Sequence, residues 1–152
     1  HLSIRRQRQM CIRDRLKEAG LDWDPKLHDF FGLPDRSMDD RVFVISDMLV
    51  TVDMLQEMQV VSFQGASEWA LDYLVTTEAV WIPREDQLRQ VLEDLLMASG
   101  RPEILMAGGL TGYRVEFFFD GEQLAFEAER PELAYAAALL HLLPRVRPRR
   151  AA

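Results

Sequence analysis

The sequence predicts an α+β fold, an antiparallel sheet with helices packed on one face. Two segments with apolar residues at helical spacing, 84–99 and 131–143, predict amphipathic helices. Between them, alternating apolar and polar residues around Asp120-Gly121 predict strands joined by a tight turn. We therefore expect a helix, a three-stranded meander and a helix in the C-terminal part, because an apolar sheet face needs such a cover.

The helix expected over residues 84–99 has signals at both ends. Pro83 stands where a helix tolerates a missing N–H donor, and Glu85 and Asp86 complement the positive end of the helix dipole. Gly100 is typical of a helix end. The apolar stripe of this helix consists of Leu88, Val91, Leu92, Leu95 and Leu96.

The meander is expected in "EILMAGGLTGYRVEFFFDGEQLAFEAE", where a glycine-rich loop at 108–112 joins the first two strands. Asp-Gly is a preferred hairpin turn, because its left-handed dihedral angles match the twist of the strands. With Asp120-Gly121 at the centre of the turn, Arg114 lies opposite Glu127, which is an attractive pair on one face. The other face is apolar and pairs Phe117 with Leu124, Val115 with Phe126 and Tyr113 with Ala128.

The second helix is expected in "RPELAYAAALLHLL", with Pro131 in its first turn. Residues 144–152, "PRVRPRRAA", are predicted to be a disordered basic tail. The folded body, residues 16–143, is then a single domain. The apolar stripe of the second helix consists of Leu133, Ala136, Ala137, Leu140 and Leu143.

The N-terminal half of the body gives weaker signals. A helical turn that ends at Gly20 precedes an irregular stretch, in which Trp23, Phe30 and Phe31 are expected to anchor a loop-rich layer. Residues 42–45 form an apolar run that is typical of a strand covered on both faces.

The stretch that follows is harder to assign. Residues 46–65 fit either a helical stripe or, at "VVSF", a second strand. Residues 66–79 are predicted to be helical with Ser67 as the N-cap, and "VWIP" is predicted to be a short strand or an extended entry to the next helix.

The first 15 residues, "HLSIRRQRQMCIRDR", carry five arginines and the only cysteine of a chain whose formal net charge is −7. The run "RRQRQMCIRD" resembles the translation of a short-read sequencing adaptor, and its flanking codons fit the layout of that adaptor. The resemblance implies that residues 1–15 are foreign and that the native N-terminus is lost before residue 16. A native arginine arm that binds phosphate is the alternative.

Leaving out residues 1–15 removes five arginines and Asp14, so the net charge of the rest becomes −11. Such an acidic body argues against a nucleic-acid partner, which needs a concentrated positive field. Cys11 is lost too, which excludes disulfides and Cys-ligated metals. No apolar run reaches the roughly 20 residues that span a bilayer, so we predict no membrane partner and a cytoplasmic location.

Motifs for cofactors or catalysis are weak. The glycine-rich "GGLTG" matches neither the dinucleotide-binding nor the P-loop pattern, and it precedes a strand, so a flexible hairpin loop is favoured. His28 and His141 belong to no metalloprotease motif. We therefore predict no catalytic residues, no cofactor and no metal ligands.

Acidic residues gather in the segment "PDRSMDDRVFVISD". Asp35, Asp39, Asp40 and Asp47 could together hold a hard cation, although their spacing differs from that of a calcium-binding loop. Solvated turns and strand ends are the favoured interpretation, since two arginines lie among them. These four residues are the candidate polar cluster.

Aromatic residues gather around the helix predicted at 66–79. Trp69, Tyr73 and Trp81 are expected mainly to pack in the core. Large aromatic side chains also dominate binding energy at protein interfaces. The three residues are therefore the candidate binding site for a protein partner.

Three stretches resemble a family of small bacterial proteins: "DFFGLPDRSMDDRVFVISDM", "EWALDYLVTTEAVWIPREDQLR" and "AYAAALLHLL". Some members of that family carry the label pilus assembly protein, which they share with a larger MinD-like ATPase. Such an ATPase needs a Walker-type phosphate loop, and the present sequence contains none, so the resemblance does not imply ATPase activity. The last third is also similar in pattern to small phage-encoded proteins.

Three functions follow from these observations. The first is a non-enzymatic accessory or interaction module that binds a protein partner. The second is a pilus assembly or secretion accessory component, as the family label implies. The third is a small metal-dependent enzyme that uses the Asp35–Asp47 cluster. The sequence favours the first, because no catalytic motif is present.

Overall fold

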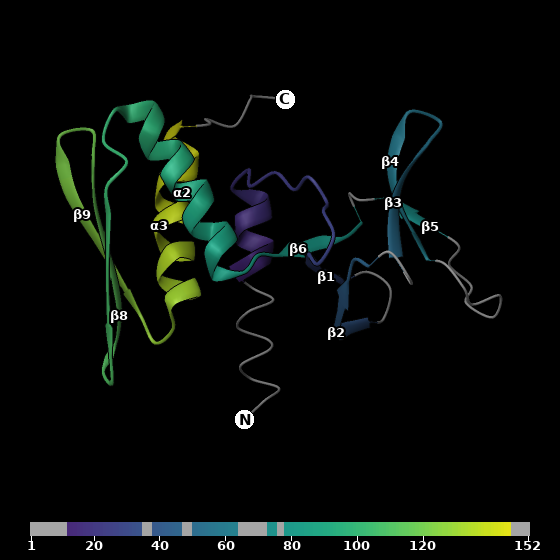
Figure 1. Cartoon of the computed structure of the whole chain (residues 1–152), viewed down its shortest axis with the longest axis horizontal. Coiled ribbons are helices and arrows are strands. Elements are labelled where there is room, and N and C mark those ends of the chain that lie inside the picture. The colour runs from purple at the N-terminus through teal and green to yellow at the C-terminus, as the bar shows by residue number, and fades with distance from the viewer. Residues whose placement is uncertain (1–11, 35–37, 47–49, 64–72, 76–77, 147–152) are drawn as a thin grey trace. The chain divides into compact units, whose positions relative to one another are not determined.

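The computed structural model describes residues 12–34, 38–46, 50–63, 73–75 and 78–146 (Figure 1). This part of the chain combines helices with antiparallel strands, which confirms the predicted α+β class. The chain divides into two compact units, His1–Lys17 with Asp22–Pro83 and Glu18–Leu21 with Arg84–Ala152, whereas the sequence predicts a single domain. The division arises because each sheet pairs strands from only one unit.

The elements of the first unit are mostly strands, and those of the second unit alternate helices with a meander. Near the start, residues 12–18 are helical. The first unit then contains β1 (Phe30–Leu33), β2 (Met38–Val44), β3 (Val50–Leu55), β4 (Met58–Phe63), β5 (Tyr73–Val75) and β6 (Val80–Ile82). The second unit contains α2 (Glu85–Ser99), β7 (Ile104–Gly109), β8 (Gly112–Phe119), β9 (Glu122–Ala128) and α3 (Pro131–Val146).

Phe31 is the centre of the first unit. It lies in β1, the middle strand of the sheet β2-β1-β6, and no part of it is exposed. Its ring lies 5.8 Å from that of Trp23 and 5.4 Å from that of Phe43. We predict a loop-rich layer around Phe31, and the structure corrects this to a strand, because neighbours on both sides satisfy the backbone of β1.

A buried carboxylate fixes the entry to β1. Asp29 is only 2% exposed, and its Oδ2 accepts hydrogen bonds from the Trp23 indole at 2.9 Å and the Lys26 backbone at 3.1 Å. Its backbone carbonyl also accepts the Ile45 N–H at 2.9 Å. These bonds compensate for the loss of water around the charge, so Asp29 has a structural role that the sequence pattern does not reveal.

Strand β2 is correctly predicted, but its burial is not. Val42 is 57% exposed and Val44 is 40% exposed, so one face of this strand is open. The prediction of a strand covered on both faces is wrong because β2 is an edge strand, and its run of apolar residues extends past the core.

Strands β3 and β4 form a hairpin in which Leu55 pairs with Met58. The turn residues Gln56 and Glu57 both have positive φ, 49° and 65°. The structure thus excludes the helical alternative for residues 50–63. Residues 73–75 form strand β5, which pairs with β4, so the predicted helix is wrong there. Pairing with a neighbouring strand decides the conformation of this segment against its helical spacing. Ser67 lies outside the described residues.

The helix near the N-terminus includes the last residues of the adaptor-like segment. Arg13 is 4% exposed, and one guanidinium nitrogen lies 2.5 Å from the position that a Cβ at Gly32 would occupy. Any side chain at Gly32 would therefore collide with Arg13. Residues 1–11 are not described, and the foreign origin of residues 1–15 stays a prediction.

The second unit contains the predicted meander β7-β8-β9. The register around Asp120 and Gly121 is as predicted, and both residues have positive φ, 51° and 82°. Helix α3 contacts β8 and β9, and α2 contacts α3 (Figure 1). The apolar sheet face, with Val115 fully buried and Phe117 4% exposed, is thereby covered.

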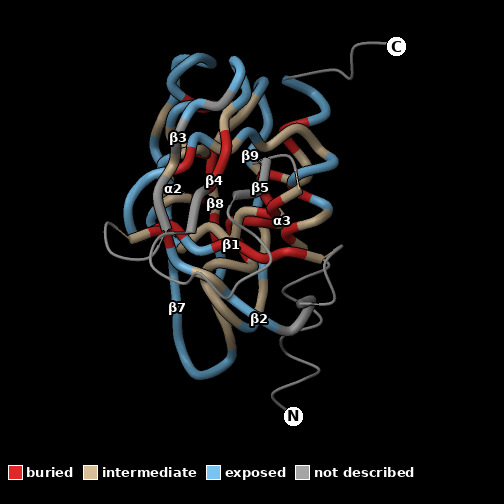
Figure 2. The backbone as a smooth tube through the Cα atoms, turned by 90° about the vertical axis from the view of Figure 1, so that its right-hand side faces the viewer, coloured by how far each residue is buried: buried red, intermediate tan, exposed pale blue. Residues whose placement is uncertain are grey.

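Both helices of the second unit begin as predicted. The Arg84 backbone N–H donates to the Gln87 side chain at 3.0 Å, and Gly100 ends α2 with φ 87°. Helix α3 continues to Val146 rather than ending at residue 143, because proline has a helical φ and Pro144 disturbs only the last turn. Figure 2 shows the buried residues along α3. The rest of the predicted tail, 147–152, lies outside the described residues.

Tyr135 is the largest fully buried side chain of this unit, at 2% exposure. Burial is the main cause that raises the pKa of its phenol above 10.0. The negative charges of Glu85 and Glu93 raise this pKa further, whereas the positive charge of Arg89 lowers it. The phenol therefore stays protonated in the folded protein at a pH where an exposed tyrosine begins to ionise.

Candidate functional site

The structure describes no side chain of the predicted polar cluster. Asp39 and Asp40 lie in β2, but their side chains are not described, and Asp35 and Asp47 lie outside the described residues. Among the residues that the structure does describe, no group of three His, Cys, Asp or Glu side chains could hold a metal ion. The metal-dependent enzyme therefore gains no support from this part of the chain.

Of the three aromatic candidates, the structure describes the side chain of Trp81 alone. Trp69 lies outside the described residues, and Tyr73 belongs to β5, with a side chain that is not described. Trp81 lies in β6 opposite Phe31 and is half-buried. Its indole N–H is buried and finds no acceptor among the described residues. Trp81 thus contributes to the first sheet and does not present its polar group to a partner.

His28 and His141 occupy structural positions. His28 lies in a turn with φ 70°, and its backbone N–H donates to the Ile45 carbonyl at 2.8 Å. His141 lies in α3 with its ring 5.4 Å from that of Phe126. The Nε2 atom of His141 is buried and has no hydrogen-bond partner among the described residues. Nothing in these contacts indicates acid–base catalysis.

The meander offers a more coherent surface on the face that the helices leave open. Side chains alternate along β8, so Arg114, Glu116 and Phe118 lie on the side opposite to the buried Val115 and Phe117. Leu105 of β7 pairs with Glu116 and is 62% exposed. We call the residues Leu105, Arg114, Glu116, Phe118 and Glu127 the open face.

One end of the open face carries a satisfied ion network. Arg114 Nη1 donates to Glu127 Oε1 at 2.8 Å, and Arg114 Nε donates to Glu116. The hydrogen bond that Arg114 donates to Glu127, and then the one it donates to Glu116, raises the pKa of Arg114. The predicted Arg114–Glu127 pair is thus confirmed, and Glu116 completes it.

The other end of the open face carries a different arginine. The guanidinium carbon of Arg101 lies 4.6 Å from the centre of the Phe118 ring, which is within the range of a cation–π interaction. No acidic partner of Arg101 occurs in the described part of the chain. Arg101 is therefore a positive group held in place by an aromatic ring rather than by a carboxylate.

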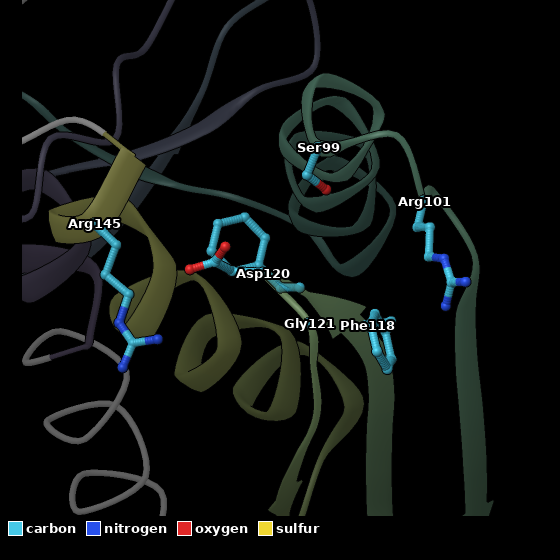
Figure 3. A pocket seen from close by; sticks show the side chains of 7 residues that line it. Ser99, Arg101, Phe118, Asp120, Gly121 and Arg145 are labelled. Atoms are coloured by element: carbon cyan, nitrogen blue, oxygen red, sulfur yellow. The ribbon is translucent and has the colours of Figure 1, made fainter.

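Two cavities meet at this residue pair. The larger, of about 870 Å³, lies between the end of α2, the β8–β9 turn and the end of α3 (Figure 3). Arg101 and Arg145 stand on opposite sides of it, with Asp120 between them (Figure 3). The smaller, of about 560 Å³, follows the open face along β7 and contains Leu105, Glu116 and Glu103. Both cavities are open to solvent, so they suit a ligand that lies along the surface.

Sequence reasoning missed this site. The alternation of polar and apolar residues predicts the apolar face of the meander. For the open face, it predicts only the Arg114–Glu127 ion pair. The signal in the sequence is Phe118, the middle one of three consecutive phenylalanines, which lies on the face that faces water. An aromatic residue there indicates that something covers it, and Arg101 does so in part.

Comparisons with known proteins add no assignment. No helix in the described residues is long and apolar enough to cross a membrane. No family model, no curated protein and no solved structure matches the chain.

Proposed function

We propose that the chain is a non-enzymatic interaction module that binds a protein partner by adding a strand of that partner to β7. The observation that carries the proposal is the free edge of β7. In the order β7-β8-β9, β7 has a single neighbouring strand. Within the described part of the chain, its second row of backbone N–H and C=O groups has no strand partner, which is the arrangement that strand addition uses.

The composition of β7 suits this role. The strand "ILMAGG" carries no charge, and its residues from Ala107 to Gly109 are exposed (Figure 2). The opposite edge, β9, contains Glu122 and Glu127. Charged residues on an edge discourage pairing with another chain, so the two edges of the sheet differ. β7 is the edge that can accept a partner.

The open face supplies side-chain contacts beside that edge. Leu105 and Phe118 provide apolar surface next to the smaller cavity. Backbone hydrogen bonds give affinity in strand addition, and pockets for alternate side chains of the added strand give specificity. A partner strand along β7 would bury apolar area that the isolated chain leaves in water.

The test uses synthetic peptides. The full chain is applied to an array of extended heptapeptides of varied sequence, and each binder is resynthesised with N-methyl groups on alternate residues, in two phases. Only one phase directs its N–H groups toward β7, because N–H groups alternate in direction along an antiparallel strand. We expect one phase to abolish binding and the other to leave it nearly unchanged.

A variant pair locates the binding edge. Leu105→Lys places a charge in β7, and Ala125→Lys places the same charge at an exposed position of β9 that lines neither cavity, as a matched control. Binding should weaken in the first variant and persist in the second. Equal sensitivity to both N-methyl phases, or an equal effect of the two lysines, would contradict strand addition at β7.

A further inference from the structure

We infer that the added strand is acidic at one position, and that Arg101 binds its carboxylate. This inference rests on the proposed function, because it names the chemistry of the partner strand. Arg101 precedes β7 by three residues. A partner strand that pairs with Ile104 and extends past the start of β7 comes level with Arg101 after roughly 10 Å.

The state of Arg101 carries the inference. Its backbone N–H donates to the Leu96 carbonyl at 3.3 Å, which fixes the main chain next to the end of α2. Its guanidinium lies over Phe118 at 4.6 Å, which limits the freedom of the side chain. A guanidinium that stacks by its face still has its N–H edge available for a carboxylate. Less ordering is then needed when the carboxylate binds.

The comparison with Arg114 shows which arginine can accept a ligand. Arg114 already donates to Glu127 at 2.8 Å and to Glu116. Arg101 is exposed and makes no ion pair within the described residues. Both arginines lie on the same sheet face, at opposite ends. An incoming carboxylate therefore meets an unused positive charge only at the Arg101 end.

The acidic neighbours restrict where the carboxylate can lie. Glu103 and Glu116 line the smaller cavity together with Leu105. Asp120 lines the larger cavity, between Arg101 and Arg145 (Figure 3). A carboxylate beside Leu105 would lie near Glu103 and Glu116, whereas one at Arg101 pairs with the guanidinium, which lines both cavities. The preferred partner strand is thus apolar along β7 and carries a single Asp or Glu at its Arg101 end.

The test measures affinity by fluorescence anisotropy with a peptide that passes the N-methyl test. Three versions are compared: Glu at the position facing Arg101, Gln at that position, and Glu moved by two residues toward Leu105. We expect the first to bind about 2- to 5-fold more tightly than the second, as for an exposed but positioned ion pair. The third should bind no better than the Gln peptide.

Variants of the chain assign the preference. Arg101→Gln should remove the preference for Glu and leave affinity for the Gln peptide within about twofold, which also verifies that the variant is folded. Arg101→Lys should retain part of the preference. Arg114→Gln is the matched control and should retain all of it. The preference should also shrink at high salt.

The outcomes separate the two ideas. A Glu preference that survives in Arg101→Gln, or no Glu preference in the unchanged chain, overturns the inference and leaves strand addition standing. Failure of every peptide in the N-methyl test overturns the proposed function, and the inference falls with it.

Discussion

Gly112 is the position at which a single methyl group should destabilise the meander most clearly. Its φ is 133°, and a Cβ built there lies 2.9 Å from the Ala128 carbonyl oxygen. A non-glycine residue in such a conformation costs about 1–3 kcal/mol. The restriction of the unfolded chain by alanine returns about 0.4–1 kcal/mol. The backbone contact adds to the cost, because Ala128 is held in β9.

We therefore expect Gly112→Ala to lower the free energy of unfolding by about 1–3 kcal/mol. For a unit of this size, each kcal/mol lowers the Tm by about 4–8 °C. Thermal unfolding followed by circular dichroism measures the shift. Gly109→Ala is the matched control, since a Cβ there meets nothing within 4 Å. Equal Tm values for the two variants would refute the strain argument.

Three further predictions concern the core, the pH dependence and the N-terminal segment. Leu139→Ala, at a site with no exposure, should cost about 2–5 kcal/mol in urea unfolding, whereas Met97→Ala, at 66% exposure, should stay within about 0.5 kcal/mol. Because the folded state raises the pKa of Tyr135, the unfolded chain releases that proton first, and stability should fall as pH rises above about 10. Tyr135→Phe should reduce this fall and leave the stability near pH 8 little changed, and an unchanged alkaline profile would contradict the assignment. Sequencing of the source locus with long reads should show that codons 1–15 are absent; their presence in the genome would refute the adaptor origin.

The meander could be predicted from the sequence because its determinants are local. Asp120-Gly121 fixes the turn, the turn fixes the register, and the register places Arg114 opposite Glu127. All of these contacts join residues that are at most about 15 positions apart in the sequence. Independent signals thus agreed on one answer, which is the condition under which a sequence specifies a structure.

The first unit could not be predicted to the same extent, because its strands pair over longer distances. Strand β1 takes one partner from β6, about 50 residues later in the chain. Tyr73 and Leu74 have helical spacing to their neighbours, yet they pair with β4. The strand partner decides such segments, and no local pattern contains that information.

The candidate site was missed for a related reason. Arg101 lies outside every predicted element, and its contact with Phe118 depends on how the end of α2 meets β8. Of the predicted aromatic candidates, Trp81 lies in the sheet β2-β1-β6, Tyr73 lies in β5 of the sheet β3-β4-β5, and Trp69 falls outside the described residues. The sequence indicates that aromatic residues matter for binding. The tertiary contacts show that the aromatic residue at the candidate site is Phe118.

The turn between β3 and β4 bears on the order in which the chain folds. Gln56 and Glu57 adopt left-handed conformations that their side chains disfavour, whereas Asp120-Gly121 adopts them readily. The meander can thus close its hairpin early from local preference, while β3 and β4 must wait for contacts made elsewhere. Until then, "VTVDML" and "MQVVSF" remain unpaired β-prone segments. We expect newly made chains to be most prone to aggregation before β3 and β4 have paired. The double variant Gln56→Asn, Glu57→Gly should shorten this period, because both new residues favour the turn.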